Sequence, residues 1–505
     1  MERGSAIFPI RTPFTSRPLN VWVVELFFRL RNPILEKQSG KPATIHRACS
    51  VQFSRIGSRE RADALLLYDV ARNIFALLHS KTCVPSVMNG NRSINRLWAA
   101  IFMIALASEV FSGAIRYYTS LAGISLLGYL PKALMVGCIV FGLVIRPRVD
   151  IILVASFLAV QMCVSLANGV SLVAACFWIW TVAPLLFVLL MPPGALDMLE
   201  SSAIRFVFVV LTTACCAGVM LNWLVHLPWV GDSIDVDGVS VQLATSTYVG
   251  TVPRLPGFGR SSATTGLVIG LLTTWLVPRQ RNTLVIVTLL AMSALAIWAT
   301  TNKTTLIALS LVLLCFAALK TPGLRRACIV MTVLMIAIPL AGWVIAATTN
   351  VGVADSGSLA SMQDRLLNTW PKLLDGMARA DLLWFGIGPG GFGSATAYYA
   401  ADFGFNTGYS DNAALYVVAN IGVAGALLVM LVFVQRVLAS RTDDPKAWLM
   451  LLFVLLSGVT TDIFEALGCL LFAGLAIRTL TVHAGRKSQF SRDGLSHAAT
   501  RAGNR

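Results

Sequence analysis

The residues with the clearest chemical potential lie in one long polar loop, roughly residues 349–411, between two apolar stretches. Arg365 stands in the first half of this loop, and Asp411 stands at its end. Between them, the segment Gly386–Gly393 holds so many glycines that a regular helix is excluded, and its backbone N–H groups could face an oxyanion. A guanidinium and a carboxylate near such a turn suit a reaction with an anionic leaving group and a proton to remove.

Two roles fit Asp411, which is followed by Asn412 and then directly by an apolar stretch. A carboxylate at the start of a helix is a natural N-cap. Beside arginines and a partly dry cavity, the same carboxylate could act as a general base. The secondary candidates for the base are His226, Asp462 and Glu465.

Three further basic residues stand at the edges of apolar stretches. Arg254 and Arg260 flank a Gly-Phe-Gly turn at the end of a second polar loop, roughly 225–261. The planar fork of arginine matches phosphate oxygens, so the pair could clamp a diphosphate, with anchoring to lipid headgroups as the alternative. Lys303 lies in a very short hinge, where an anionic ligand and a snorkelling side chain are both consistent with its position.

The composition defines the elements that must position these residues. The chain is 56% hydrophobic and 13% charged with a mean hydropathy of +0.74, whereas soluble domains carry about 25% charged residues. We therefore expect an all-α polytopic membrane protein with about twelve transmembrane helices and two extracytoplasmic loops, the larger partly helical. The expected spans are 97–115, 125–145, 150–168, 171–191, 203–224, 262–277, 283–300, 304–320, 326–348, 412–434, 446–462 and 464–480.

The distribution of basic residues predicts the orientation. They cluster in hinges such as 146–148, 279–281 and 320–326 and at both ends of the chain, and the positive-inside rule makes that side cytoplasmic. Both termini are then cytoplasmic, and loops 225–261 and 349–411 are extracytoplasmic. We divide the chain into a basic extension (1–95), a transmembrane domain (96–482) and a basic tail (483–505). Because a clean apolar stretch follows soon after Met88, the extension is either a cytosolic segment or sequence upstream of the true start.

Other classes of protein fit less well. The net charge of +16 sits in hinges and chain ends, so a topogenic role explains it better than nucleic-acid binding. Most cysteines lie in or beside apolar stretches with no CxxC pair, which argues against disulfides and zinc. A transporter should show paired broken helices and mid-span ionisable residues, and Glu109 is the clearest ionisable residue inside an expected span.

Taken in order, these motifs resemble the O-antigen ligase and O-antigen/exopolysaccharide polymerase superfamily of bacterial inner-membrane proteins, over about residues 97–480. The glycine turn followed by the Asn-Ile-Gly stretch is the most specific part of the resemblance. The motifs are Arg254-x-x-Gly257, the hinge with Lys303 before Thr304, Arg365 with Trp370, Gly386-Ile-Gly388-x-Gly390, a polar pair before Asn412, and Asn420-Ile-Gly422-Val-Ala-Gly425.

The resemblance implies transfer of a glycan from undecaprenyl diphosphate to a sugar hydroxyl at the outer face of the inner membrane, without a nucleotide sugar or another cofactor. It places the diphosphate against Arg254, Lys303 and Arg365. Two positions depart from the family: Lys303 stands where arginine is usual, and Asp411 stands where histidine is usual. The expected site comprises the catalytic residues Asp411 and Arg365 and the substrate-binding residues Arg254, Arg260, Lys303, Gly388, Gly390 and Asn412.

The expected function is thus a polymerase of lipid-linked repeat units in exopolysaccharide or O-antigen synthesis. A ligase that moves the glycan to lipid A-core, a polysaccharide transporter or flippase, and a structural subunit of an assembly complex are the alternatives. The expected partners are the undecaprenyl-diphosphate-linked glycan, membrane lipids, and a chain-length regulator and flippase of the same pathway. No nucleic acid is expected.

Overall fold

The computed structural model describes residues 92–145, 149–236, 239–249, 252–348, 360–399, 401–440 and 444–481. The predictions for residues 1–91 of the basic extension and for the tail 483–505 lie outside these residues, whereas residues 92–95 of the predicted extension belong to the first described helix.

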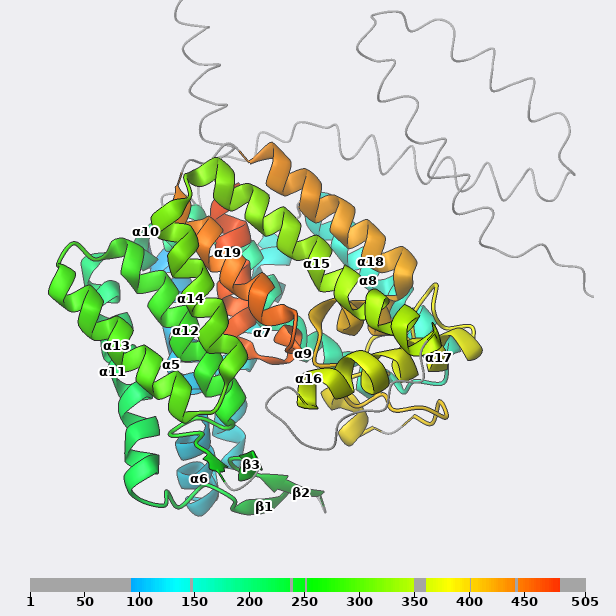
Figure 1. Cartoon of the computed structure of the whole chain (residues 1–505), viewed down its shortest axis with the longest axis horizontal. Helices are drawn as coiled ribbons and strands as arrows, with labels where there is room; N and C mark the ends of the chain where they lie inside the picture. The colour runs from blue at the N-terminus through cyan, green and yellow to red at the C-terminus, as the bar shows by residue number, and fades with distance from the viewer. Residues whose placement is uncertain are drawn as a thin grey trace, which may run out of the picture. The chain divides into compact units, whose positions relative to one another are not determined.

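Long helices make up most of the described chain (Figure 1). Each of the twelve expected spans coincides with a helix, but only six described segments are long and apolar enough to cross a membrane: α5, Ser125–Leu143, α9, α11, α15 and most of α18. The long helices are α5 (Arg92–Val110), α7 (Leu130–Ile145), α8 (Val149–Ala167), α9 (Leu172–Leu190), α11 (Ser202–Leu224), α12 (Ser262–Leu276), α13 (Thr283–Ala299), α14 (Lys303–Ala318), α15 (Thr321–Thr348), α18 (Ala413–Ala439), α19 (Pro445–Gly458) and the last described helix, Leu467–Thr481.

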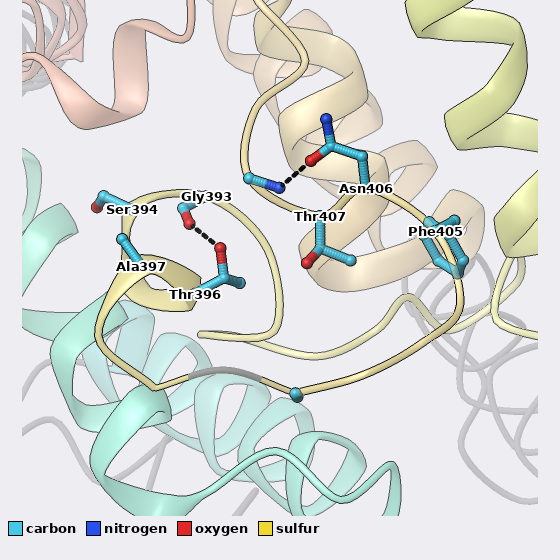
Figure 2. Close-up of a pocket in the computed structure, with 9 residues that line it drawn as sticks. Gly393, Ser394, Thr396, Ala397, Phe405, Asn406 and Thr407 are labelled. Atoms are coloured by element: carbon cyan, nitrogen blue, oxygen red, sulfur yellow. Dashed lines mark hydrogen bonds between the residues drawn. The ribbon is translucent and has the colours of Figure 1, made fainter.

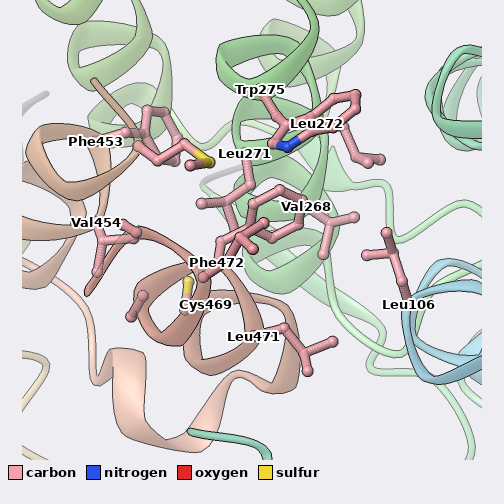
Figure 3. Packing of buried hydrophobic residues seen from close by; sticks show 14 of the residues in the cluster. Leu106, Val268, Leu271, Leu272, Trp275, Phe453, Val454, Cys469, Leu471 and Phe472 are labelled. Atoms are coloured by element: carbon pink, nitrogen blue, oxygen red, sulfur yellow. The ribbon is translucent and has the colours of Figure 1, made fainter. Parts of the chain in front are cut away.

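The core of the bundle forms around α12, α19 and the last described helix. Trp275, Phe453 and Phe472, one from each of these three helices, are fully buried in the same apolar cluster (Figure 3). Nearly every residue of α12 is buried, which explains how a helix of 15 residues with little polar surface sits in the middle of the bundle. Because other helices cover α12, contact with lipid falls to the outer helices. Among these, α13 and α15 expose large apolar side chains.

One end of the bundle collects most of the irregular chain, and we call it the loop end: residues 111–129, 225–261, 300–302, 360–411 and 459–466. Hydrogen bonds join the first three segments, from Gly113 N to Phe258 O at 2.9 Å and from Arg254 Nε to Thr301 Oγ1 at 3.1 Å, and they join the last two, from Arg365 Nη1 to Thr460 O at 3.3 Å. The two sets approach each other where Arg116 interacts electrostatically with Tyr398. The two polar loops singled out in the sequence therefore lie at the same end of the bundle.

The opposite end carries basic and acidic hinges. Arg279 donates through Nε to Glu200 at 2.8 Å and lies 4.2 Å above the ring of Trp275. The acidic hinge around residue 200 and the basic hinge at 279–281 are therefore at the same end, as the orientation derived from the sequence requires.

Three local features differ from the expectation. The first span does not continue to residue 115, because the chain bends at Phe111 between α5 and a short helix, α6 (Ser112–Leu121). Another short helix, α10 (Pro193–Leu199), lies in the hinge before α11. Loop 225–261 adds strands to the all-α expectation, as the hairpins β1 (Ser233–Val236)–β2 (Val239–Gln242) and β3 (Thr247–Val249)–β4 (Val252–Arg254).

Candidate functional site

Arg365 and Asp411 form an ion pair at the loop end. The Nη2 atom of Arg365 lies 2.9 Å from Oδ2 of Asp411, and the two side chains keep 22% and 37% of their surface exposed. Arg365 also donates through Nη1 to the carbonyl oxygen of Thr460 at 3.3 Å. Two contacts thus fix the guanidinium, while Oδ1 of Asp411 has no hydrogen-bond partner among the described residues.

A local widening of the helix presents Arg365. The short helix α16 (Ala360–Asp364) continues into a single π-helical turn, Arg365–Thr369, and then into α17 (Trp370–Arg379). The carboxylate of Asp364 accepts bonds from Asn368 Nδ2 and Thr369 Oγ1, both at 2.9 Å, and so holds the wide turn. Single π turns of this kind are frequent at functional sites. The expectation that the larger loop is partly helical is confirmed over its described part.

Asp411 is not the N-cap of α18, which corrects one of its two expected roles. Asn412 performs that task, because its Oδ1 accepts from Leu415 N at 2.9 Å. Asp411 instead has a left-handed backbone with φ of 52°. For residues other than glycine, this conformation is favoured most by asparagine and aspartate.

Asn412, expected to bind substrate, is fully buried. Besides its cap bond, it donates through Nδ2 to Met335 O at 3.2 Å and to Val459 O at 3.0 Å. Through these hydrogen bonds, Asn412 fixes the start of α18 against α15 and α19. Asn412 could contact substrate only if these bonds were broken.

Asp462 holds the backbone that carries Asp411. Its carboxylate accepts four hydrogen bonds of 2.8–3.1 Å: from the amide and hydroxyl of Ser410 and from the amides of Asp411 and Asn412. Burial raises the pKa of Asp462 to about 6, with a further contribution from the negative charge of Asp411. Because each oxygen already accepts two bonds, Asp462 suits a positioning role better than that of the base.

The glycine turn packs on the ends of two helices. Gly388 and Gly390 are buried with positive φ, and a Cβ at either position would overlap the backbone of Ser165 or of Ala174. Asn168, at the end of α8, donates to the carbonyl oxygens of Gly386 and Ile387 at 3.1 and 3.0 Å. This packing accounts for the glycines, and their predicted contact with substrate remains a prediction.

The same turn inserts into a break in α18. Gly422 lies inside this helix with φ of 71° and ψ of 172°, so the helix is interrupted there. Across the break, Ile387 N donates to Ala419 O at 2.8 Å and Val423 N donates to Leu383 O at 2.9 Å. The two most specific motifs of the family resemblance, the glycine turn and the Asn-Ile-Gly stretch, therefore contact each other directly.

Arg254 and Lys303 are both bonded to Thr301, at another part of the loop end. Arg254 donates to the hydroxyl of Thr301, and the amide of Lys303 donates to the carbonyl oxygen of Thr301 at 3.1 Å. The side chain of Lys303 is exposed and makes no ion pair within the described residues.

Arg260 belongs to a cluster of cations that the sequence did not single out, the basic cluster of Arg116 on α6, Lys132 on α7 and Arg260. Each of the three interacts electrostatically with the other two and with Glu109 near the end of α5. None of the three cations makes an ion pair or a side-chain hydrogen bond among the described residues. Burial, followed by the charge of Arg260, lowers the pKa of Arg116. Arg116 and Lys132 are half-buried whereas Arg260 is exposed, and a half-buried cation without an ion pair is costly unless an anion reaches it.

The turn formed by residues 459–466 lies between these two sets of charges. On one side, Thr460 and Asp462 hold Arg365 and the segment of Asp411. On the other side, Glu465 interacts electrostatically with Lys132 and accepts from Ser394 N at 2.7 Å. Burial raises the pKa of Glu465. The eight residues of this turn therefore connect the ion pair to the basic cluster.

The structure thus separates the charged residues of the expected site into three groups: Arg365 with Asp411, Arg254 with Lys303, and Arg260 with the basic cluster. Contact of Arg254, Lys303 and Arg365 with one diphosphate, which the resemblance implies, remains a prediction. The sequence missed Arg116 and Lys132 because each lies in or beside an apolar stretch, where a lone cation resembles a helix-end anchor.

Comparison with protein-family models, with curated proteins and with solved structures finds no match to this chain. The family resemblance rests on the order of the motifs.

Proposed function

We propose that this chain polymerises undecaprenyl-diphosphate-linked oligosaccharide units, for exopolysaccharide or O-antigen, at the extracytoplasmic face of a bacterial inner membrane. One observation carries the proposal: through Asp462 the turn 459–466 binds the segment of Asp411, a carboxylate with a free oxygen, and through Glu465 it interacts with Lys132 of the basic cluster. A transfer from a lipid diphosphate needs both, a proton acceptor for the incoming hydroxyl and positive charge for the leaving group.

In the proposed reaction, the acceptor hydroxyl gives its proton to Oδ1 of Asp411. The hydroxyl oxygen bonds to the anomeric carbon of the donor, and the bond between that carbon and the diphosphate oxygen breaks. The diphosphate leaves with the electron pair, and the basic cluster neutralises its charge. Arg365 orients the carboxylate of Asp411 through their ion pair, and attack opposite the leaving group inverts the anomeric centre.

The location of the charges favours this reaction over transport. Glu109 and Lys132 are ionisable residues inside expected spans, but both lie at the loop end of their helices. Glu109 is two residues before the bend at Phe111, and Lys132 is in the first turn of α7. A proton or ion path would place such groups near the middle of the bundle.

The substitution Asp411→Asn tests the proposal. Asparagine tolerates the left-handed backbone and Asn412 supplies the cap, so the change removes the base without removing a structural contact other than the ion pair. We expect a loss of about 10²–10⁴ in rate, the usual effect of losing a general base. Cells with this variant should accumulate lipid-linked single repeat units at a normal level of membrane protein.

Analysis of the glycan by gel and mass spectrometry separates the outcomes. Polymer of normal length from Asp411→Asn would contradict the assignment of the base. Polymer of normal length that is no longer attached to lipid A-core would indicate a ligase instead. Asp381→Asn is a matched control, because Asp381 also has a positive φ in the same loop but makes no side-chain bond that the structure records.

A further inference from the structure

An open pocket of about 410 Å³ lies beside the end of the glycine turn, between residues 393–397 and 401–408 (Figure 2). Its volume falls within the range of roughly 300–1,000 Å³ that is typical of small-molecule sites. The lining residues carry no charged side chain; they supply hydroxyl groups, an amide and the ring of Phe405.

Part of this polar lining is free to bind a ligand. Thr396 uses its hydroxyl on Gly393 O at 2.8 Å, and Asn406 uses its Oδ1 on Gly408 N at 2.9 Å. The Nδ2 group of Asn406 and the hydroxyl of Thr407 have no partner among the described residues. An amide donor, a hydroxyl that both donates and accepts, and an aromatic ring match the hydroxyls and the apolar face of a sugar ring.

The walls of the pocket are fixed in place. The amide of Gly393 donates to Thr407 O at 2.9 Å, which ties the two walls together. The ring of Phe405 packs so closely on Gly376 that a Cβ there would lie 2.5 Å from it. A site ordered before binding loses less entropy when a ligand enters.

The pocket also connects to the charges described above. The amide of Ser394, which lines the pocket, donates to the carboxylate of Glu465, and Glu465 interacts electrostatically with Lys132 of the basic cluster. We propose that this pocket binds a neutral sugar residue at the accepting end of the glycan, on the side of Glu465 away from the basic cluster. The identification of the sugar as the acceptor rests on the proposed function, whereas binding of a neutral sugar does not.

Binding is measured on the purified full-length protein in detergent by saturation-transfer NMR. The probes are the methyl glycosides of glucose, galactose and mannose, with methyl glucuronide as the charged comparison. Ala397→Trp should abolish the signal, because Ala397 is an exposed lining residue and its replacement fills the pocket. Ala378→Trp is the matched control, since Ala378 is equally exposed on α17 but does not line the pocket.

A second pair of variants tests the polar contact. Thr407→Val should weaken binding several-fold, and Thr407→Ser should retain it, because only the first removes the hydroxyl. The proposal is overturned if no neutral glycoside gives a signal, if the signal survives Ala397→Trp, or if the glucuronide binds as well as the neutral glycosides. Asp411→Asn should bind the glycosides as the wild type does, so a failed assignment of the base and a failed sugar pocket give different results.

Discussion

At the scale of single residues, the carboxylates of Asp411 and Asp462 differ in how many hydrogen bonds they accept, and this difference separates their roles. Asp411 keeps a free oxygen beside a fixed guanidinium, whereas every acceptor position of Asp462 is occupied by an N–H or O–H group. The first can accept a proton from a substrate, and the second shapes the backbone that presents the first. Neither spacing nor residue type distinguishes the two aspartates in the sequence.

The titration of Asp462 predicts opposite effects of pH on activity and stability. Because its pKa in the folded protein is raised from 3.8 to about 6, the group contributes stability that is complete below about pH 4 and is lost as the pH rises through 6. Polymer formation should instead increase across the same range, because only the ionised carboxylate accepts all four bonds.

Thermal unfolding and glycan synthesis, each measured from about pH 5 to 8, check this prediction. Asp462→Asn should be inactive at every pH, since its amide group would face donors. An activity that is flat across this range in both proteins would remove Asp462 from the positioning of Asp411.

A second prediction at this scale concerns the basic cluster. If it holds the diphosphate, Lys132→Met should weaken donor binding by about 2–5 kcal/mol, the usual loss for a desolvated charged contact. The effect should appear as a higher KM for the lipid-linked donor with a smaller change in kcat. Lys320→Met, at the opposite end of the bundle, should leave both constants unchanged. An unchanged KM for Lys132→Met would place the diphosphate elsewhere, with Arg254 and Lys303 as the next candidates.

At the scale of elements, the glycine turn and the break in α18 depend on each other. Gly422→Ala should strongly reduce the amount of folded protein, because a Cβ there would overlap the carbonyl oxygen of Trp384. Gly404→Ala is the control: Gly404 has nearly the same φ, 72° against 71°, but no atom lies within 4 Å of its Cβ position. Backbone strain alone costs about 1 kcal/mol, so this variant should remain folded.

Fluorescence-detected size-exclusion chromatography of the two variants, with heating, measures the difference. Equal thermal midpoints would mean that the turn does not fill the break in the native protein.

The positions of the elements were largely predictable from the sequence, and their interruptions were not. Long apolar runs locate the helices, because only a helix satisfies its own backbone in lipid. The bend at Phe111 and the break at Gly422 lie inside apolar runs, where hydropathy does not change. The hairpins of loop 225–261 were missed because their strands are only three or four residues long.

The site was predictable only in its separate parts. Arg365 and Asp411 were identified by residue type and by position in a polar loop, but their ion pair depends on a π turn and on the four hydrogen bonds that Asp462 accepts. Lys132 could be found only through its neighbours in space, since Glu109 and Arg260 are far from it in the sequence.

At the scale of the whole molecule, the orientation in the membrane is testable. The loop end should face the outside, because the basic hinges are at the other end. An alkaline phosphatase fusion after residue 380 should therefore be active, and one after residue 280 should be inactive. The reverse pattern would place the candidate site in the cytoplasm and exclude a periplasmic polymerase.

The insertion of the glycine turn into the break of α18 also sets an order of events during synthesis. Residues 386–393 leave the ribosome before Ala419 and Val423, the residues whose backbone they and their neighbours bind. The loop therefore remains undocked until the following helix, α18, has been synthesised and inserted. Only then can the glycine turn pack into the break of that helix. A chain arrested before Gly425 should leave this loop open to added protease, and a chain released just after it should not.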